Sequence, residues 1–164
     1  DNLLKSISQY FEKKGFIFID WLKYCPDLFI HNDFVTNIKP SKNALQNLEK
    51  AKKIFNYYGK LDIGQSLIIQ NKLVLGVEAI EGTDLLIKRC ANYKRKGDNG
   101  ILLKLIKYKQ DKRFDLPTIG IKTIKLLKKY HYEGIFIQKK YCIIIEKDKV
   151  IKFANKNNLF IAGI

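Results

Sequence analysis

The chain has 164 residues, enough for one domain with a substantial hydrophobic core. Its formal net charge at pH 7 is +15, and all but three of its 31 basic residues are lysine. Because no apolar run approaches the roughly 20 residues of a membrane-spanning helix, and no signal peptide is visible, we expect neither feature.

The positive charge raises the question of nucleic-acid binding, because basic domains often bind phosphate backbones. The lysines are spread along the chain, whereas nucleic-acid binders draw more on arginine and on aromatic side chains placed for stacking. The composition therefore argues against nucleic acid. A positive surface fits equally well with an anionic membrane leaflet or a pyrophosphate substrate.

The cysteines and histidines show no spacing typical of a metal site or a disulfide framework. Cys25, Cys90 and Cys142 are far apart, odd in number and embedded in apolar sequence. We expect them to be reduced thiols that act as small hydrophobic side chains. His31 and His131 lack any ligand spacing, which argues against a catalytic triad or a histidine-rich metal centre.

The first 60 residues predict two helices and one short strand. Apolar residues recur at helical spacing from Leu3 to Phe11, and Gly15 is a plausible end signal. Residues 16–20 read as a short buried strand, and residues 21–39 as irregular chain. A long amphipathic helix runs from Ala44 to Tyr58, with Ser41 as its N-cap and Gly59 as its end.

A hairpin and a helix follow. The β-like runs 64–70 and 73–80 are joined by Asn71 and Lys72, which predicts a hairpin turn. Glu81-Gly82-Thr83-Asp84 then leads into a helical pattern, with Thr83 or Asp84 as the N-cap. Gly82 would let the backbone approach a ligand closely. An ordinary capped helix explains the same spacing.

Residues 101–106 form a continuous apolar run that predicts a central strand covered on both faces. Lys104 stands in the middle of it. A buried lysine is costly unless it is paired, so Lys104 is either a side chain that extends its ammonium to solvent or a phosphate ligand.

The last third of the chain predicts two helices and three strands. A helix begins near Lys122 and ends before Gly134, and Asp148 caps a second helix; the strands are 134–138, 141–145 and 159–161. The whole chain, 1–164, therefore predicts a single α/β domain: a mixed sheet with helices on both faces, in three layers.

Residues 110–120, from Gln110 to Gly120, gather two carboxylates, two cations, a glutamine and a threonine between the predicted central strand and a helix. Connections between a strand and a helix are where α/β sheets place ligand sites. Carboxylates can hold a divalent metal, and Arg113 with helix-terminal amides can hold phosphate oxygens. A solvated turn with an ion pair is the alternative.

Several segments together resemble the signature segments of the LpxI-type UDP-2,3-diacylglucosamine pyrophosphatases. They are Asp62-Ile63-Gly64-Gln65, Val77 to Asp84, Arg113 to Gly120 and Asn158 to Gly163. The resemblance spans nearly the whole chain and corresponds to that family's C-terminal domain. It implies that an N-terminal domain is missing from this chain, which begins at Asp1 and has no methionine.

The resemblance implies a hydrolase of lipid A biosynthesis in a Gram-negative bacterium. The reaction would split the pyrophosphate of UDP-2,3-diacylglucosamine into UMP and 2,3-diacylglucosamine 1-phosphate, with Mg²⁺ or another divalent cation. The implied protein is cytoplasmic and peripheral at the inner membrane. Its partners would be the lipid-linked UDP-sugar, the missing N-terminal domain, an anionic membrane and a second copy in a homodimer.

Under this resemblance we predict three groups of site residues. The catalytic group is Asp115, Asp111 and Lys104, and the metal ligands are Asp111, Asp115 and Glu78. The substrate-binding group is Gln65, Glu81, Gly82, Thr83, Asp84, Arg113 and Thr118. Two alternatives stay open: a non-catalytic domain that binds lipid or nucleotide, and a basic scaffold for nucleic acid.

Overall fold

The structure is a computed structural model that describes residues 2–108 and 111–164. A five-stranded sheet in the order β2-β1-β3-β5-β7 runs through it. The strands β1 and β2 form an antiparallel hairpin, β1 also pairs antiparallel with β3, and β3, β5 and β7 are parallel. Their bounds are Ser66–Gln70 (β1), Leu73–Val77 (β2), Ile101–Lys104 (β3), Gly134–Ile137 (β5) and Phe160–Gly163 (β7).

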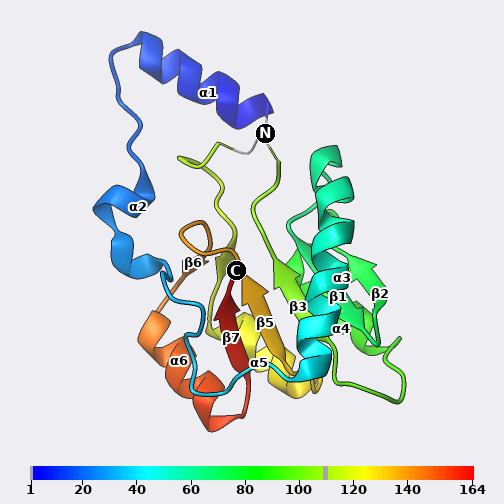
Figure 1. The fold of residues 1–164 in the computed structure, drawn as a ribbon. Helices are drawn as coiled ribbons and strands as arrows, with labels where there is room; N and C mark the ends of the chain where they lie inside the picture. The colour runs from blue at the N-terminus through cyan, green and yellow to red at the C-terminus, as the bar shows by residue number, and fades with distance from the viewer. Residues whose placement is uncertain (1, 109–110) are drawn as a thin grey trace.

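Helices cover both faces of this sheet (Figure 1). One face packs against α3 (Lys42–Tyr58), and the other against α4 (Thr83–Ala91), α5 (Ile121–Lys129) and α6 (Lys147–Lys156). Side chains alternate between the two hydrophobic cores: Leu102 faces the three helices, while Ile101 and Leu103 face α3. The predicted three-layer α/β fold with a mixed sheet is confirmed.

Local sequence explains the helix and hairpin that frame the site. The Ser41 side chain accepts a hydrogen bond from the Ala44 amide at 3.1 Å, which caps α3 as predicted. Asn71 and Lys72 both have positive φ angles, 50° and 62°. A two-residue hairpin turn with both angles positive matches the twist of the flanking strands, and the predicted hairpin is confirmed.

The structure corrects several predicted boundaries and caps. Residues 16–20 form no strand, and Ile17 is 87% exposed, so the apolar run does not enter the sheet. The run 141–145 contributes only β6 (Ile143–Ile144), which pairs with β4 (Thr118–Ile119) in a separate two-stranded sheet. The N-caps of α4 and α6 are Gly82 and Glu146, not Thr83, Asp84 or Asp148, which lie one to two positions inside their helices.

Residues 2–28 lie largely outside the layered core. Figure 1 shows α1 (Asn2–Lys13) standing apart from the sheet, followed by α2 (Trp21–Tyr24) and the short 3-10 helix η1 (Pro26–Leu28). A second 3-10 turn, η2 (Gly59–Leu61), continues α3. None of the helices in the described residues is long and apolar enough to span a membrane.

The three cysteines differ in accessibility, which gives a direct test of the packing. Cys90 and Cys142 are buried and Cys25 is exposed. Burial raises the pKa of the Cys90 thiol to about 11 and that of Cys142 to about 12. Because the thiolate is the reactive form, we expect one thiol to react rapidly with an aromatic disulfide reagent at pH 8, and all three after unfolding.

The Cys25→Ser variant is the control for this experiment and should show no rapid labelling in the native state. Rapid labelling of two or three thiols in the native protein would contradict the burial of Cys90 in α4 and of Cys142 just before β6.

Candidate functional site

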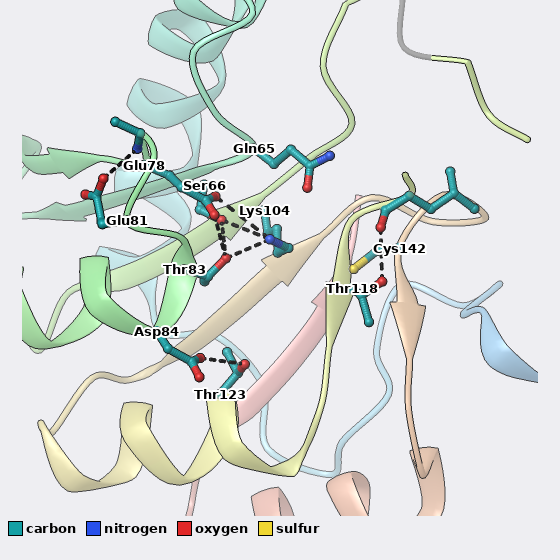
Figure 2. A network of polar contacts seen from close by, with 12 residues as sticks. Gln65, Ser66, Glu78, Glu81, Thr83, Asp84, Lys104, Thr118, Thr123 and Cys142 are labelled. Carbon is teal, nitrogen blue, oxygen red and sulfur yellow. Dashed lines mark hydrogen bonds and ion pairs between the residues drawn. The ribbon is translucent and has the colours of Figure 1, made fainter. Parts of the chain in front are cut away.

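A buried polar cluster lies where β3 ends. The Lys104 side chain donates to the Thr83 hydroxyl at 2.7 Å and to the Ser66 hydroxyl at 3.4 Å, and the two hydroxyl oxygens are 3.2 Å apart (Figure 2). Lys104 is the last residue of β3, Ser66 the first of β1 opposite it, and Thr83 the first of α4. Only 4% of Lys104 is exposed, so its ammonium does not extend to solvent, and that alternative is wrong.

Glu78 supplies the negative charge of this cluster. Its Oε1 accepts from the Thr83 hydroxyl at 3.0 Å, and its Oε2 lies 3.8 Å from the Lys104 ammonium. Although this distance makes an ion pair, Oε2 has no hydrogen-bond partner among the described residues. Glu78 is 9% exposed. A buried charge needs a counter-charge, so Lys104 and Glu78 stabilise each other inside the protein.

The start of α4 presents backbone amides beside this cluster. Gly82 is its N-cap, with no side-chain cap and with a φ of 77°, a region that favours glycine. The first amides of a helix have no partner within the helix and favour negative charge. Asp84, in the first turn, instead contacts α5: it accepts from the Thr123 hydroxyl at 3.1 Å and pairs with Lys122 at 3.0 Å.

Glu81 belongs to a different set of contacts. Its carboxylate accepts from the Arg89 guanidinium at 2.6 Å and from the Ala79 amide at 3.0 Å. The hydrogen bond from Arg89 holds the pKa of Glu81 below its usual range. Glu81 therefore fixes the loop between β2 and α4 instead of facing Lys104.

The loop before β4 contains an exposed ion pair with several hydrogen bonds. The Arg113 guanidinium donates to both oxygens of Asp111, the shortest contact being 2.8 Å, and to Glu12 of α1 at 2.7 Å. These bonds hold the pKa of Asp111 below its usual range and raise that of Arg113. The Phe114 ring packs on Phe18, with centroids 4.8 Å apart. The loop is thus tied to the N-terminal segment. Gln110, the first residue of the predicted segment, lies outside the described residues.

Asp115 lies at a sharp turn in the same loop, with a φ of 33°. Its backbone carbonyl accepts from the Gln65 side-chain amide at 3.3 Å, and Gln65 immediately precedes β1. The Thr118 hydroxyl donates to the Leu116 carbonyl at 3.0 Å. In Figure 2 the Gln65 side chain lies above Lys104, and the Thr118 side chain lies below and to the right of it.

Five of the predicted site residues thus form two groups at the carboxyl end of β3. Thr83, Lys104 and Glu78 form one group, and Asp111 and Arg113 form the other; the Gln65 bond to Asp115 links them. In residues 2–108 and 111–164, no three His, Cys, Asp or Glu side chains gather into a group that could hold a metal ion. The predicted ligand set of Asp111, Asp115 and Glu78 does not form a single donor set in this conformation.

The sequence pattern did not single out three residues of this region. Ser66 faces Lys104 because the two are register partners in β1 and β3. Cys142 lies near Lys104. Burial raises the pKa of the Cys142 thiol, and the Lys104 charge lowers it by a smaller amount. Tyr58 lies at the end of α3, and burial, then the Glu78 charge, raises its pKa. Only the pairing of strands could have revealed Ser66, and no local signal marks the other two.

Two comparisons with known proteins identify the family of this chain. Residues 31–162 match the family model described as the LpxI C-terminal domain. The chain belongs to the LpxI C-terminal domain family. A second comparison, with individual proteins, finds the UDP-2,3-diacylglucosamine pyrophosphatase LpxI of Caulobacter vibrioides, which is 30% identical over 170 aligned residues. That alignment covers 100% of this chain and 61% of the relative's length.

The family model includes every predicted site residue, from Gln65 to Thr118, and leaves out α1, α2 and η1. The Lys104 cluster and the Asp111–Asp115 loop therefore both belong to the LpxI C-terminal domain.

The ion pair of Lys104 and Glu78 predicts strong coupling between these residues in folding. Lys104→Met leaves a buried carboxylate without its counter-charge, so we expect the free energy of unfolding to fall by about 3–5 kcal/mol. In the double variant Lys104→Met/Glu78→Gln, the free energy of unfolding measured by urea denaturation should be at least about 1 kcal/mol higher than the sum of the two single effects predicts. The control Lys88→Met, at an exposed position of α4, should stay within about 0.5 kcal/mol.

Additive effects of the two substitutions would contradict the ion pair.

The hydroxyl of Tyr58 gives a second prediction. This oxygen is buried without a hydrogen-bond partner among the described residues, while the ring packs on Phe55 with centroids 4.8 Å apart. Tyr58→Phe keeps the ring and removes the unsatisfied group, so the free energy of unfolding should stay unchanged or rise by about 1 kcal/mol.

Tyr132→Phe is the matched control, because the Tyr132 hydroxyl donates to the Ile87 carbonyl at 3.2 Å. This change should lower the free energy of unfolding by about 1 kcal/mol. A larger loss from Tyr58→Phe than from Tyr132→Phe would show that the Tyr58 hydroxyl is bonded in solution.

Proposed function

We propose that this domain takes part in hydrolysis of the pyrophosphate bond of UDP-2,3-diacylglucosamine, giving UMP and 2,3-diacylglucosamine 1-phosphate in lipid A biosynthesis. The observation that carries the proposal is membership in the LpxI C-terminal domain family. The Caulobacter vibrioides relative bears the name of this activity. Since the chain spans 61% of that relative, the whole protein's activity stays a proposal for this chain.

The Lys104 cluster supports the proposal through its charge and its donors. Water attack on a pyrophosphate places negative charge on the phosphate oxygens, and fixed cations and hydrogen-bond donors stabilise that charge. Lys104, the Thr83 hydroxyl and the first amides of α4 converge at the end of β3. A phosphate oxygen would replace the Thr83 hydroxyl as an acceptor from Lys104, and Glu78 would continue to hold the ammonium in place.

The loop carboxylates have distinct roles in the proposal. Asp115 is the first candidate to orient and deprotonate the attacking water. Its φ of 33° is a strained backbone conformation, and such conformations cluster at active sites. Asp111 is the second candidate, but its carboxylate already binds Arg113, which lowers its basicity. Arg113 would neutralise phosphate charge once its bond to Glu12 opens.

The remaining predicted residues bind or orient the substrate. Gln65 and Thr118 would contact the sugar or the nucleotide, and Gly82 with Thr83 would contact a phosphate. Asp84 and Glu81 would act indirectly: Asp84 joins α4 to α5, and Glu81 fixes the loop before α4.

Dependence on Mg²⁺ is a separate part of the proposal. The three predicted ligands do not form one donor set in the described residues, so no catalytic step is assigned to the metal. A titration of activity with Mg²⁺ after chelation tests the dependence. Loss of activity on chelation and its return with Mg²⁺ would support it.

The cellular setting is also a proposal. A cytoplasmic protein at the surface of the inner membrane would meet a substrate with acyl chains there, and the net charge of +15 favours an anionic leaflet. A homodimer and an N-terminal domain are further proposed partners. Sedimentation tests the homodimer. Measuring UMP release with and without the rest of the Caulobacter vibrioides relative tests the N-terminal domain.

A non-catalytic binding domain is the second candidate function. Sites for ligands often lie between domains, so a single domain tested alone can bind its ligand without turnover. UMP release should be measured for this chain alone and for this chain supplied with the rest of the Caulobacter vibrioides relative. Release only in the second case supports a divided site, and release in neither case supports the binding domain.

In the form that turns over, Asp115→Asn should lower kcat by at least about 100-fold, because the substitution removes the charge that activates water or stabilises the transition state. Asp148→Asn, at an exposed position of α6, is the control and should leave kcat unchanged. The readout is UMP formation at saturating substrate, with thermal unfolding measured for both variants.

If Asp115→Asn kept kcat within twofold of the unsubstituted protein, Asp115 would not be a catalytic residue, and Asp111 would become the candidate.

A further inference from the structure

Arg113, in the loop before β4, binds two carboxylates with different parts of its guanidinium group. Its Nε and Nη2 atoms donate to the two oxygens of Asp111 at 3.1 and 2.8 Å, and its Nη1 atom donates to Glu12 at 2.7 Å. The planar guanidinium presents its N–H donors in a fixed fork, which suits carboxylate and phosphate groups alike. The Nη1 end of Arg113 is therefore already taken by a carboxylate.

The two carboxylates are tied to Arg113 in different ways. Asp111 belongs to the same turn: its side chain also accepts from the Arg113 backbone amide at 3.0 Å, and its carbonyl accepts from the Phe114 amide at 3.1 Å. Glu12 lies 101 positions away in the sequence, in the last turn of α1. Among residues 2–108 and 111–164, the Glu12 carboxylate bonds to Arg113 alone. Glu12 can therefore leave Arg113 without unfolding the loop.

The contact between α1 and the loop is open to exchange. Figure 1 shows α1 standing apart from the sheet, and the Arg113 and Glu12 side chains are 36% and 38% exposed. Exposed ion pairs contribute little net stability, because water and salt screen them. A phosphate or pyrophosphate group carries more charge than a carboxylate and accepts from a guanidinium in the same geometry. Such a group can therefore displace Glu12 from Arg113.

Arg113 is linked to the rest of the candidate site through its own loop. Asp115 follows it two residues later, and the Asp115 carbonyl accepts from the Gln65 side chain at 3.3 Å. Gln65 immediately precedes Ser66, whose hydroxyl accepts from Lys104. The Nη1 atom of Arg113 is thus an anion position at the edge of the candidate site, and the protein's own carboxylate occupies it.

We propose that Glu12 competes with the phosphate group of a ligand for Arg113, so that α1 sets how tightly the candidate site binds anions. The Glu12 carboxylate holds the Nη1 atom before the ligand binds and is displaced when a pyrophosphate group arrives. Glu12 is thus a positioning residue that acts through Arg113. The inference deepens the proposed function, on which it rests for the identity of the ligand. A Glu12 that instead holds Arg113 ready for the ligand predicts the opposite change in affinity.

Binding of inorganic pyrophosphate to this chain, measured by isothermal titration calorimetry, is the first test. Glu12→Gln keeps the size of the side chain and removes its charge, so it should raise the affinity at least about threefold. Glu49→Gln is the control: it removes the same charge from an exposed position of α3, where Glu49 pairs with Lys52, and should leave the affinity unchanged. Unchanged or weaker binding by Glu12→Gln, or no binding of pyrophosphate by either protein, would overturn the proposal.

A double-mutant cycle shows whether the effect passes through Arg113. Arg113→Gln should weaken pyrophosphate binding at least about threefold, and adding Glu12→Gln to it should change the affinity by less than about 1.5-fold. In the neighbouring variant Lys112→Gln, which removes a cation that donates to Tyr141, Glu12→Gln should keep its full effect. An equal gain from Glu12→Gln with and without Arg113 would overturn the proposal, because the gain would then come from net charge alone.

In the form that turns over, the same competition changes KM and not kcat. Glu12→Gln should lower KM for UDP-2,3-diacylglucosamine at least about threefold and keep kcat within about twofold, as expected for a change in uniform binding. Glu49→Gln should change neither constant. A lower kcat with an unchanged KM would overturn the proposal, because Glu12 would then act in the reaction itself.

The binding measurements require no hydrolysis, so their failure is distinguishable from failure of the proposed function. Absence of UMP release with a retained effect of Glu12→Gln on pyrophosphate binding removes the proposed reaction and keeps the competition. UMP release without any effect of Glu12→Gln removes the competition and keeps the reaction.

Discussion

A lysine ammonium buried at the end of the central strand is the constraint around which this end of the domain is organised. Lys104 is 4% exposed, and an uncompensated charge at such a position would cost several kcal/mol. Its partners come from three separate elements: Ser66 from β1, Glu78 from the loop after β2 and Thr83 from α4. The hairpin, the first helix after it and the central strand must therefore come together for the charge to be tolerated.

The same constraint relates stability to function. Residues that hold a buried ammonium group in a fixed place also prepare it for an anionic ligand. The entropy cost of ordering that side chain is then met during folding and not on binding. In the proposed function Glu78 serves both, because one of its oxygens bonds to Thr83 and the other forms the ion pair with Lys104. The loop of Asp111 and Arg113 is different: its groups are exposed, and its ion pair can rearrange at little cost.

Periodicity and capping predicted most of the layered fold. The spacing of apolar residues in α3, the cap at Ser41 and the turn at Asn71 and Lys72 are local features, and the structure agrees with each. Residues 16–20 were wrongly predicted as a strand because a short apolar run does not say whether a neighbouring strand is available to pair with it. The predicted strand 141–145 is only two residues long in the structure for a related reason: its pairing partner is β4, which lies outside the main sheet.

The candidate site was predicted in part. Lys104 stood out as the one charge in an apolar strand, and Thr83 stood at a helix start, but their contact depends on the register between β1, β3 and the hairpin. The roles of Asp84 and Glu81 could not be predicted, because their partners Thr123 and Arg89 are selected by tertiary packing. Family resemblance identified the segments, and the structure identified which side chains within them meet.

We propose above all that Lys104 is the cation that receives a phosphate group. A crystal structure of the active form with UMP and a sugar 1-phosphate product bound would test it. We predict a phosphate oxygen within hydrogen-bond distance of the Lys104 ammonium and of the first amides of α4, with the Glu78 ion pair retained. Both phosphate groups bound elsewhere, with the Lys104 contacts to Thr83 and Ser66 unchanged, would contradict the account and leave Lys104 as a purely structural residue.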